Sequence, residues 1–73
     1  MKITVNGKPR DIDAPDGGAA VDLPAFLRTH DINPRLVAIA INGHVVPKDE
    51  YDAALIREGD AVEVVRMVGG GAR

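Results

Sequence analysis

The sequence contains no cysteine and no tryptophan, and it has a single Phe and a single Tyr. Without cysteine the chain can form no disulfide, thiolate nucleophile or thiolate metal site. With so few aromatic residues it offers almost no surface on which nucleic-acid bases could stack. The 9 basic and 11 acidic residues are interspersed, with a net charge of −2, and form no basic stripe. We therefore expect no nucleic-acid partner.

Long apolar runs are also absent, so we expect no membrane span. The first residues, MKITVNGK, lack the apolar core of a signal peptide, and we expect a cytoplasmic protein. At 73 residues the chain is one domain. A domain of this size buries only about 60% of the surface that its unfolded chain exposes. That leaves little room for an enclosed active site.

The first residues predict a β-hairpin. Residues 2–6 alternate between apolar and polar side chains, with Ile3 on the inward face. Asn6–Gly7 is typical of a tight hairpin turn, and residues 8–13 return as a second strand. Pro9 cannot donate a hydrogen bond within a sheet, so the second strand is expected at a sheet edge.

One helix is expected. A loop at 14–19 leads into residues 21–32, where Asp22 is the expected N-cap and the break comes at Asn33–Pro34. The spacing of Leu23, Phe26 and Leu27 places these three side chains on one apolar face.

Three more strands complete the pattern. Residues 35–43 predict a central strand, in which Val37, Ile39 and Ile41 point one way and Ala38 and Ala40 point the other. The turn Asn42–Gly43 leads to a short strand at 44–46. Residues 47–56 read as irregular or as one helical turn, and residues 61–68 as the last strand.

This order predicts an α+β fold of the β-grasp, or ubiquitin-like, kind. Such a fold has a mixed sheet of four to five strands with one main helix packed on one face. The last strand pairs with the first in parallel at the centre of the sheet, and the chain then leaves as a flexible glycine tail. We expect residues 1–68 to be the β-grasp domain and residues 69–73 to be the tail.

No arrangement of residues in the sequence predicts catalysis. The candidates are His30, His44, the acidic group Asp49, Glu50 and Asp52, and the pair Gly17–Gly18. Neither histidine has neighbours that complete a metal site or a triad, and we expect both at the surface. The acidic group fits a solvated turn. The glycine pair lacks the wider pattern of a phosphate loop. We therefore expect no enzyme activity and no metal site.

The sequence ends RMVGGGAR. A glycine-rich end can simply be frayed. Alternatively, because glycine has no Cβ, Gly69, Gly70 and Gly71 could thread a channel too narrow for side chains and present a main-chain carboxylate. At about 3.3–3.6 Å per residue, the stretch from Val68 to Gly71 could enter a partner's site while the domain stays outside.

An apolar patch is expected beside this tail. By strand alternation Ala38, Ala40, Val65 and Met67 share the outward face of two strands, and Val68 follows them. Such a patch fits a surface that docks a partner. Two alternatives remain open: a loop covers these side chains, or they are scattered apolar residues without a role.

Several segments together resemble the ThiS family, the sulfur carriers of thiamine biosynthesis. They are KITVNGKPRDI, VAIAINGHVVPKDEY and REGDAVEVVRMVGGG, with the spacings between them. The resemblance covers nearly the whole chain, and residues 37–71 are its most specific part. The small subunit of molybdopterin synthase is related and shares the fold and the tail.

The resemblance implies a role for the tail. A ThiF-like adenylyltransferase would use ATP to adenylate the carboxylate of the terminal glycine, here Gly71, with Gly69 and Gly70 threaded into its site. Sulfur supplied through a cysteine desulfurase would convert that carboxylate to a thiocarboxylate, and a ThiG-like thiazole synthase would accept the sulfur. The carrier itself binds no cofactor and is not an enzyme.

The chain departs from the family at one place. Family members generally end in Gly-Gly, whereas Ala72 and Arg73 follow Gly71 here. The Gly71 carbonyl is thus part of a peptide bond, so a processing protease would have to remove Ala72-Arg73. Two other readings stay open. One is a carrier for another pathway (molybdopterin, cysteine, siderophore-type or tRNA thiolation), and the other is a β-grasp interaction module with an inert tail.

Overall fold

The computed structural model describes residues 1–14 and 17–67, and its main element is a five-stranded sheet with the order β2-β1-β7-β4-β5. The strands are β1 (Lys2–Val5), β2 (Lys8–Asp11), β4 (Val37–Ile41), β5 (His44–Val45) and β7 (Ala61–Arg66). β7 lies in the middle, parallel to β1 and antiparallel to β4. The expected mixed sheet is confirmed, and so is the edge position of the strand that carries Pro9. β4 is an interior strand, but the middle position belongs to β7.

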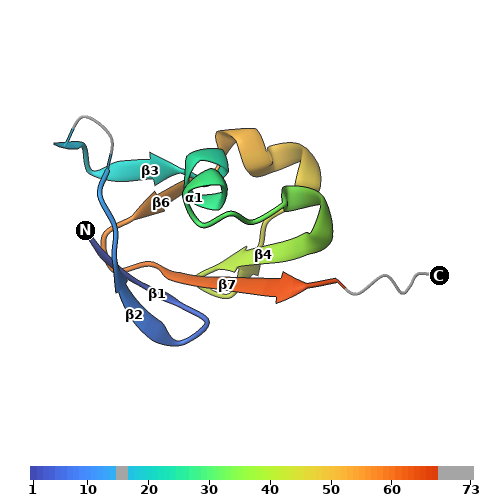
Figure 1. Ribbon diagram of the computed structural model, residues 1–73, viewed down its shortest axis with the longest axis horizontal. Helices are drawn as coiled ribbons and strands as arrows, with labels where there is room; N and C mark the ends of the chain where they lie inside the picture. Colours follow the sequence, from blue (N-terminus) through green and yellow to red (C-terminus); the bar gives the residue numbers. More distant parts are fainter. Residues whose placement is uncertain (15–16, 68–73) are drawn as a thin grey trace.

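A second layer covers one face of this sheet (Figure 1). It consists of α1 (Leu23–Thr29) and a separate two-stranded sheet of β3 (Ala20–Asp22) and β6 (Leu55–Arg57), with the short 3-10 helices η2 (Pro34–Leu36) and η3 (Lys48–Ala53) beside them. One helix on one face of a mixed sheet, with parallel first and last strands, is the β-grasp fold.

The core lies between the two layers. Ten side chains are at most 6% exposed: Ile3, Val21, Leu23, Phe26, Leu27, Val37, Ile39, Tyr51, Ile56 and Val62. Each fully buried aliphatic or aromatic side chain of this kind stabilises the fold by about 1.5–3 kcal/mol relative to the exposed state. The sheet contributes Ile3, Val37, Ile39 and Val62. The next positions on the same face, Val5, Ile41 and Val64, point the same way but are half-buried. The Tyr51 hydroxyl donates to the Val37 carbonyl oxygen at 3.2 Å, so its polar atom is satisfied.

The helix is shorter than the sequence predicted. Residues 20–22 are a strand because their main chain pairs with residues 55–57. The N-cap is confirmed, since the Asp22 carboxylate accepts from the Ala25 amide at 2.7 Å. The helix then ends at Thr29, and Asp31 takes a left-handed conformation with φ of 61°. The Ile32 amide donates to the Leu27 carbonyl across that turn at 2.8 Å, a common way to end a helix.

The strand β6 was not predicted at all. Residues 47–56 were read as irregular or as one helical turn, and the 3-10 helix η3 fits that reading only up to Ala53. The remainder joins β6, where Ile56 is fully buried. Three residues are too few for an alternating pattern to identify a strand.

Candidate functional site

The candidate site begins where β7 ends. β4 pairs with β7 as far as Val37 opposite Arg66, and the Met67 amide donates to the Leu36 carbonyl at 2.8 Å. The main chain is therefore held by the sheet up to Met67. Val68, Gly69, Gly70, Gly71 and the pair Ala72-Arg73 lie outside the described residues.

An apolar stripe runs along the uncovered face of the sheet toward this point. Ala38 lies opposite Val65, and Ala40 lies opposite Val45. Val45 is 73% exposed, Val65 60% and Met67 45%, while the two alanines are half-buried. We call Ala38, Ala40, Val45, Val65 and Met67 the outer stripe. Ala38, Ala40, Val65 and Met67 thus lie on the outward face, as the strand alternation predicted. No loop among the described residues covers Val65 or Met67.

Val45 was not among the residues predicted for this patch. The sequence carried a signal for it, since a short strand was expected at 44–46. The face on which Val45 lies depends on the pairing register of β4 and β5, and that register places Val45 opposite Ala40. The opposite neighbour of Ala40 is Glu63, so the stripe has a carboxylate at its border.

The histidines and acidic residues named from the sequence lie on different elements of the described chain. His44 is exposed on β5, whereas His30 is half-buried at the end of α1 rather than fully at the surface. The His30 Nδ1 donates to the Phe26 carbonyl at 3.0 Å, and the two rings stack with centroids 4.3 Å apart. Asp49 and Glu50 are exposed in η3. Within residues 1–14 and 17–67 no three potential metal ligands gather at one place.

Comparison with known proteins identifies the family. The model of the ThiS family matches residues 3–71. The chain belongs to the ThiS family. The crystal structure of the thiamine biosynthesis protein ThiS from Geobacter metallireducens is similar, with 33% sequence identity and a TM-score of 0.81. The match covers 97% of this chain and 100% of that chain. The solution structure of the Geobacter protein gives 32% identity and a TM-score of 0.75, over 100% of this chain and 91% of that chain.

Curated relatives of this ThiS-family chain include longer proteins. The thiazole synthases of Paramagnetospirillum magneticum and Magnetococcus marinus are 32% and 35% identical to it over 71 residues, which is 97% of this chain. The chain spans about a fifth of their length, 20% in each case. An uncharacterized protein of Porphyra purpurea, ycf40, is 31% identical over 97% of this chain and 93% of its own length.

The longest helix of the second layer, α1, has seven residues. None of the helices in the described part of this ThiS-family chain has the length and apolar character needed to cross a membrane.

Proposed function

We propose that this chain is a sulfur carrier for thiazole formation in thiamine biosynthesis, and that Gly71 carries the sulfur as a thiocarboxylate. The observation that carries the proposal is the position of β7. It lies in the middle of the sheet and pairs with β4 up to Arg66, the Met67 amide bonds the Leu36 carbonyl of η2, and the chain continues in sequence directly into VGGG. A rigid strand is thereby joined to residues whose side chains would not obstruct a narrow site.

The proposed chemistry requires nothing reactive on the carrier except a carboxylate. A Gly71 carboxylate oxygen attacks the α-phosphorus of ATP on a ThiF-like partner, and pyrophosphate leaves. A desulfurase persulfide then attacks the acyl carbon, and AMP leaves. A thiol reductant cleaves the resulting acyl disulfide, which leaves the thiocarboxylate on Gly71 and a mixed disulfide between the desulfurase cysteine and the reductant. The absence of cysteine from this chain agrees with a reaction in which the other reactants supply every reactive group except the carboxylate. A ThiG-like thiazole synthase is the proposed acceptor, and the similarity of the chain to two thiazole synthases supports that choice.

The outer stripe is the proposed docking surface for the activating partner. Its most exposed members near the tail are Val65 and Met67, with Ala38 and Ala40 between them and Val45. Val68 would extend the same surface. Exposed apolar patches of this kind on a small soluble domain are typical of protein interfaces.

Processing after Gly71 is part of the proposal. In the sequence Ala72 is joined to the Gly71 carbonyl, so no carboxylate exists there until that peptide bond is hydrolysed. An uncleaved Ala72-Arg73 extension would also place a long cationic side chain in a glycine-sized channel. Two further residues would also extend the chain by about 7 Å beyond Gly71 at extended spacing.

The test compares three purified forms of the chain: full length, ending at Gly71, and ending at Gly70. Each is incubated with a ThiF-like enzyme, ATP and a sulfide source, and the product is followed by intact mass. We expect rapid replacement of one oxygen by sulfur only on the form that ends at Gly71, because a misplacement of even 1 Å can reduce a rate by about 100-fold. Equal reaction of the full-length form, with Arg73 retained, would refute Gly71 as the reactive residue. No activation of any form would favour a non-covalent interaction module instead.

A further inference from the structure

A groove lies on the helix-covered face of the sheet, close to the end of β7. α1 has only seven residues, or about 10 Å at 1.5 Å per residue, so it covers only part of the sheet. Beyond the helix, the half-buried side chains of Val5 and Val64 form the floor of the groove. This groove is on the opposite face of the sheet from the outer stripe.

Two arginines line the groove from core-facing register positions. Arg10 lies opposite Ile3, and Arg66 lies opposite Val37. Ile3 and Val37 are only 3% and 4% exposed, so the side chains on this face of the sheet normally enter the core. The arginines instead lie beyond the end of α1 and are exposed. Among the residues that the structure describes, neither guanidinium forms a salt bridge.

The main chain of β7 is open on the same side. β1 follows β7 only as far as Val5 opposite Val62, and the Asn6 side chain then bonds both main-chain groups of Val64. The next residue that faces this way is Arg66. Arg66 and Val37 form a non-hydrogen-bonded pair of the antiparallel ladder, because the next pair, Met67 and Leu36, is joined by the hydrogen bond from the Met67 amide to the Leu36 carbonyl. The Arg66 N–H and C=O therefore point away from β4 in the plane of the sheet, toward the side where β1 has ended, and they have no protein partner within the described residues. Such an edge is a template for another strand.

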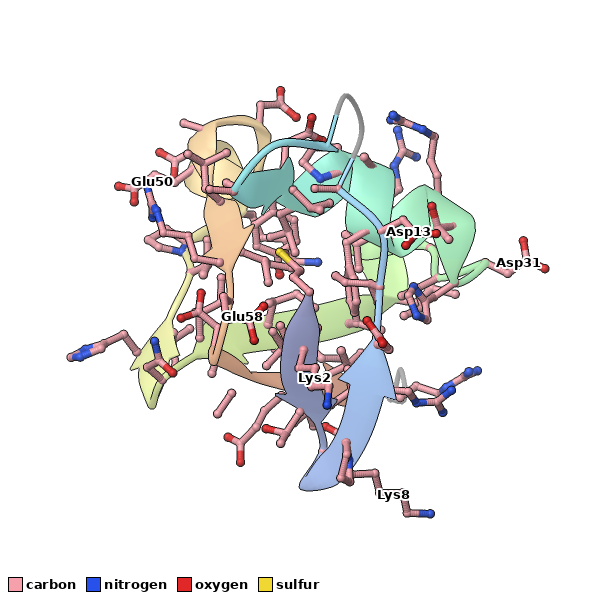
Figure 2. All side chains as sticks on the ribbon, turned by 90° about the vertical axis from the view of Figure 1, so that its left-hand side faces the viewer. Lys2, Lys8, Asp13, Asp31, Glu50 and Glu58 are labelled. Atoms are coloured by element: carbon pink, nitrogen blue, oxygen red, sulfur yellow. The ribbon has the colours of Figure 1, made fainter. Side chains whose placement is uncertain are left out.

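Among the described residues that line the groove, Asp31 is the one acidic side chain, and it forms no salt bridge with either arginine. Figure 2 shows the Asp31 side chain directed outward from the edge of the molecule. Lys8, at the end of the first hairpin, also projects into solvent (Figure 2). His30 uses its Nδ1 on the Phe26 carbonyl. The groove thus presents positive charge over an apolar floor.

We propose that this groove receives an extended acidic segment of the partner that activates the tail, paired as a strand with Arg66 and with its carboxylates on Arg10 and Arg66. The positive charges of Arg10 and Arg66 favour an acidic occupant, and the unpaired N–H and C=O of Arg66 favour an extended one. Proximity favours the activating enzyme as the partner, because Arg66 is five residues before Gly71, or about 17 Å at extended spacing. A partner site that holds Gly71 therefore lies within about 17 Å of Arg66. The inference rests on the proposed function and concerns docking, not the reacting atoms.

The test uses a purified ThiF-like enzyme and the carrier form that ends at Gly71. Binding rates are measured by surface plasmon resonance over a range of salt concentrations, for wild type, the double variant Arg10→Glu with Arg66→Glu, and the control Arg57→Glu. Arg57 is an exposed arginine on β6, at the end of the molecule away from the end of β7 (Figure 1). We expect the double variant to associate about tenfold more slowly and with a weaker salt dependence, since charge pairs mainly govern association. The control should associate at nearly the wild-type rate.

Hydrogen exchange of the wild-type Arg66 amide, free and bound, provides a measurement that no substitution can disturb. We expect strong protection in the complex and little protection without it. Equal binding by the double variant, an equal loss with Arg57→Glu, or an unprotected Arg66 amide in the complex would each overturn the groove proposal and leave the carrier function intact. Failure of the wild type itself to bind would overturn the proposed function as well.

Discussion

The side chain of Asn6 takes the place of a strand beside Val64. Its Oδ1 accepts from the Val64 amide at 2.8 Å, and its Nδ2 donates to the Val64 carbonyl at 3.2 Å. Asn6 occupies the first turn position of the hairpin with φ of 53°, a conformation that Asn tolerates better than most residues. One residue therefore both turns the chain and continues the pairing of β7 past the end of β1.

This relationship predicts that Asn6→Gly destabilises the domain by about 1–2 kcal/mol. Two hydrogen bonds with a net value of about 0.5–1.5 kcal/mol each are lost, while glycine keeps the left-handed turn without strain and offsets part of the loss. Urea-induced unfolding measures the difference. The neighbouring exposed variant Lys8→Ala, expected within about 0.5 kcal/mol of wild type, is the control. If Asn6→Gly were as stable as Lys8→Ala, the side-chain pairing would contribute nothing.

The second Asn-Gly turn is used in a similar way. Asn42 also has φ of 53°, and its Oδ1 accepts from the Ala61 amide at 2.9 Å while its Nδ2 donates to Asp60 Oδ1 at 2.9 Å. The sequence correctly predicted both turns. It could not predict the side-chain bonds, because a turn motif specifies local backbone conformation and carries no information about which distant strand lies beside it.

The lack of long-range information in local sequence patterns also explains which other features the sequence predicted and which it did not. Alternation placed Val65 and Met67 outward, and alternation through Val62 and Val64 places Arg66 on the core-facing side. Its exposure there depends on where α1 ends, and the predicted helix was longer than the real one. Likewise β6 is defined by its pairing with β3, a long-range contact that leaves no periodic signal in three residues.

The second prediction compares two adjacent residues of β6 that differ in burial. Ile56 is fully buried, whereas Leu55 is 41% exposed. We expect Ile56→Ala to destabilise the domain by about 2–5 kcal/mol, through lost burial and a cavity, and Leu55→Ala to cost less than about 1 kcal/mol. Chemical unfolding of both variants checks this. Similar losses for the two would mean that β6 does not pack as described.

A third prediction concerns the boundary between domain and tail. In the described part of the chain the last fully buried residue is Val62, and the sheet bonds extend to Met67. Removal of everything after Val68 should therefore change the free energy of unfolding by only a small fraction of 1 kcal/mol. Since 1 kcal/mol shifts the melting temperature of a domain of this size by about 4–8 °C, we expect a shift of less than about 2 °C. Calorimetry of both forms decides the point. A drop of 5 °C or more would show that residues 69–73 pack on the body, against the expected boundary.

The last prediction tests the outer stripe as a docking surface. Met67 is 45% exposed, and its main-chain bond to Leu36 does not involve the side chain, so Met67→Glu should fold normally. A charge in the centre of an apolar interface should weaken binding to a ThiF-like enzyme by about 2 kcal/mol or more if Met67 is a hot spot, or roughly 30-fold in affinity. Leu55→Glu is the matched control, since Leu55 is similarly exposed, at 41%, but lies on β6. Calorimetric titration of both variants separates the outcomes. A loss confined to Met67→Glu places the interface on the stripe, whereas unchanged affinity for Met67→Glu, or an equal loss for Leu55→Glu, removes the stripe from the docking surface.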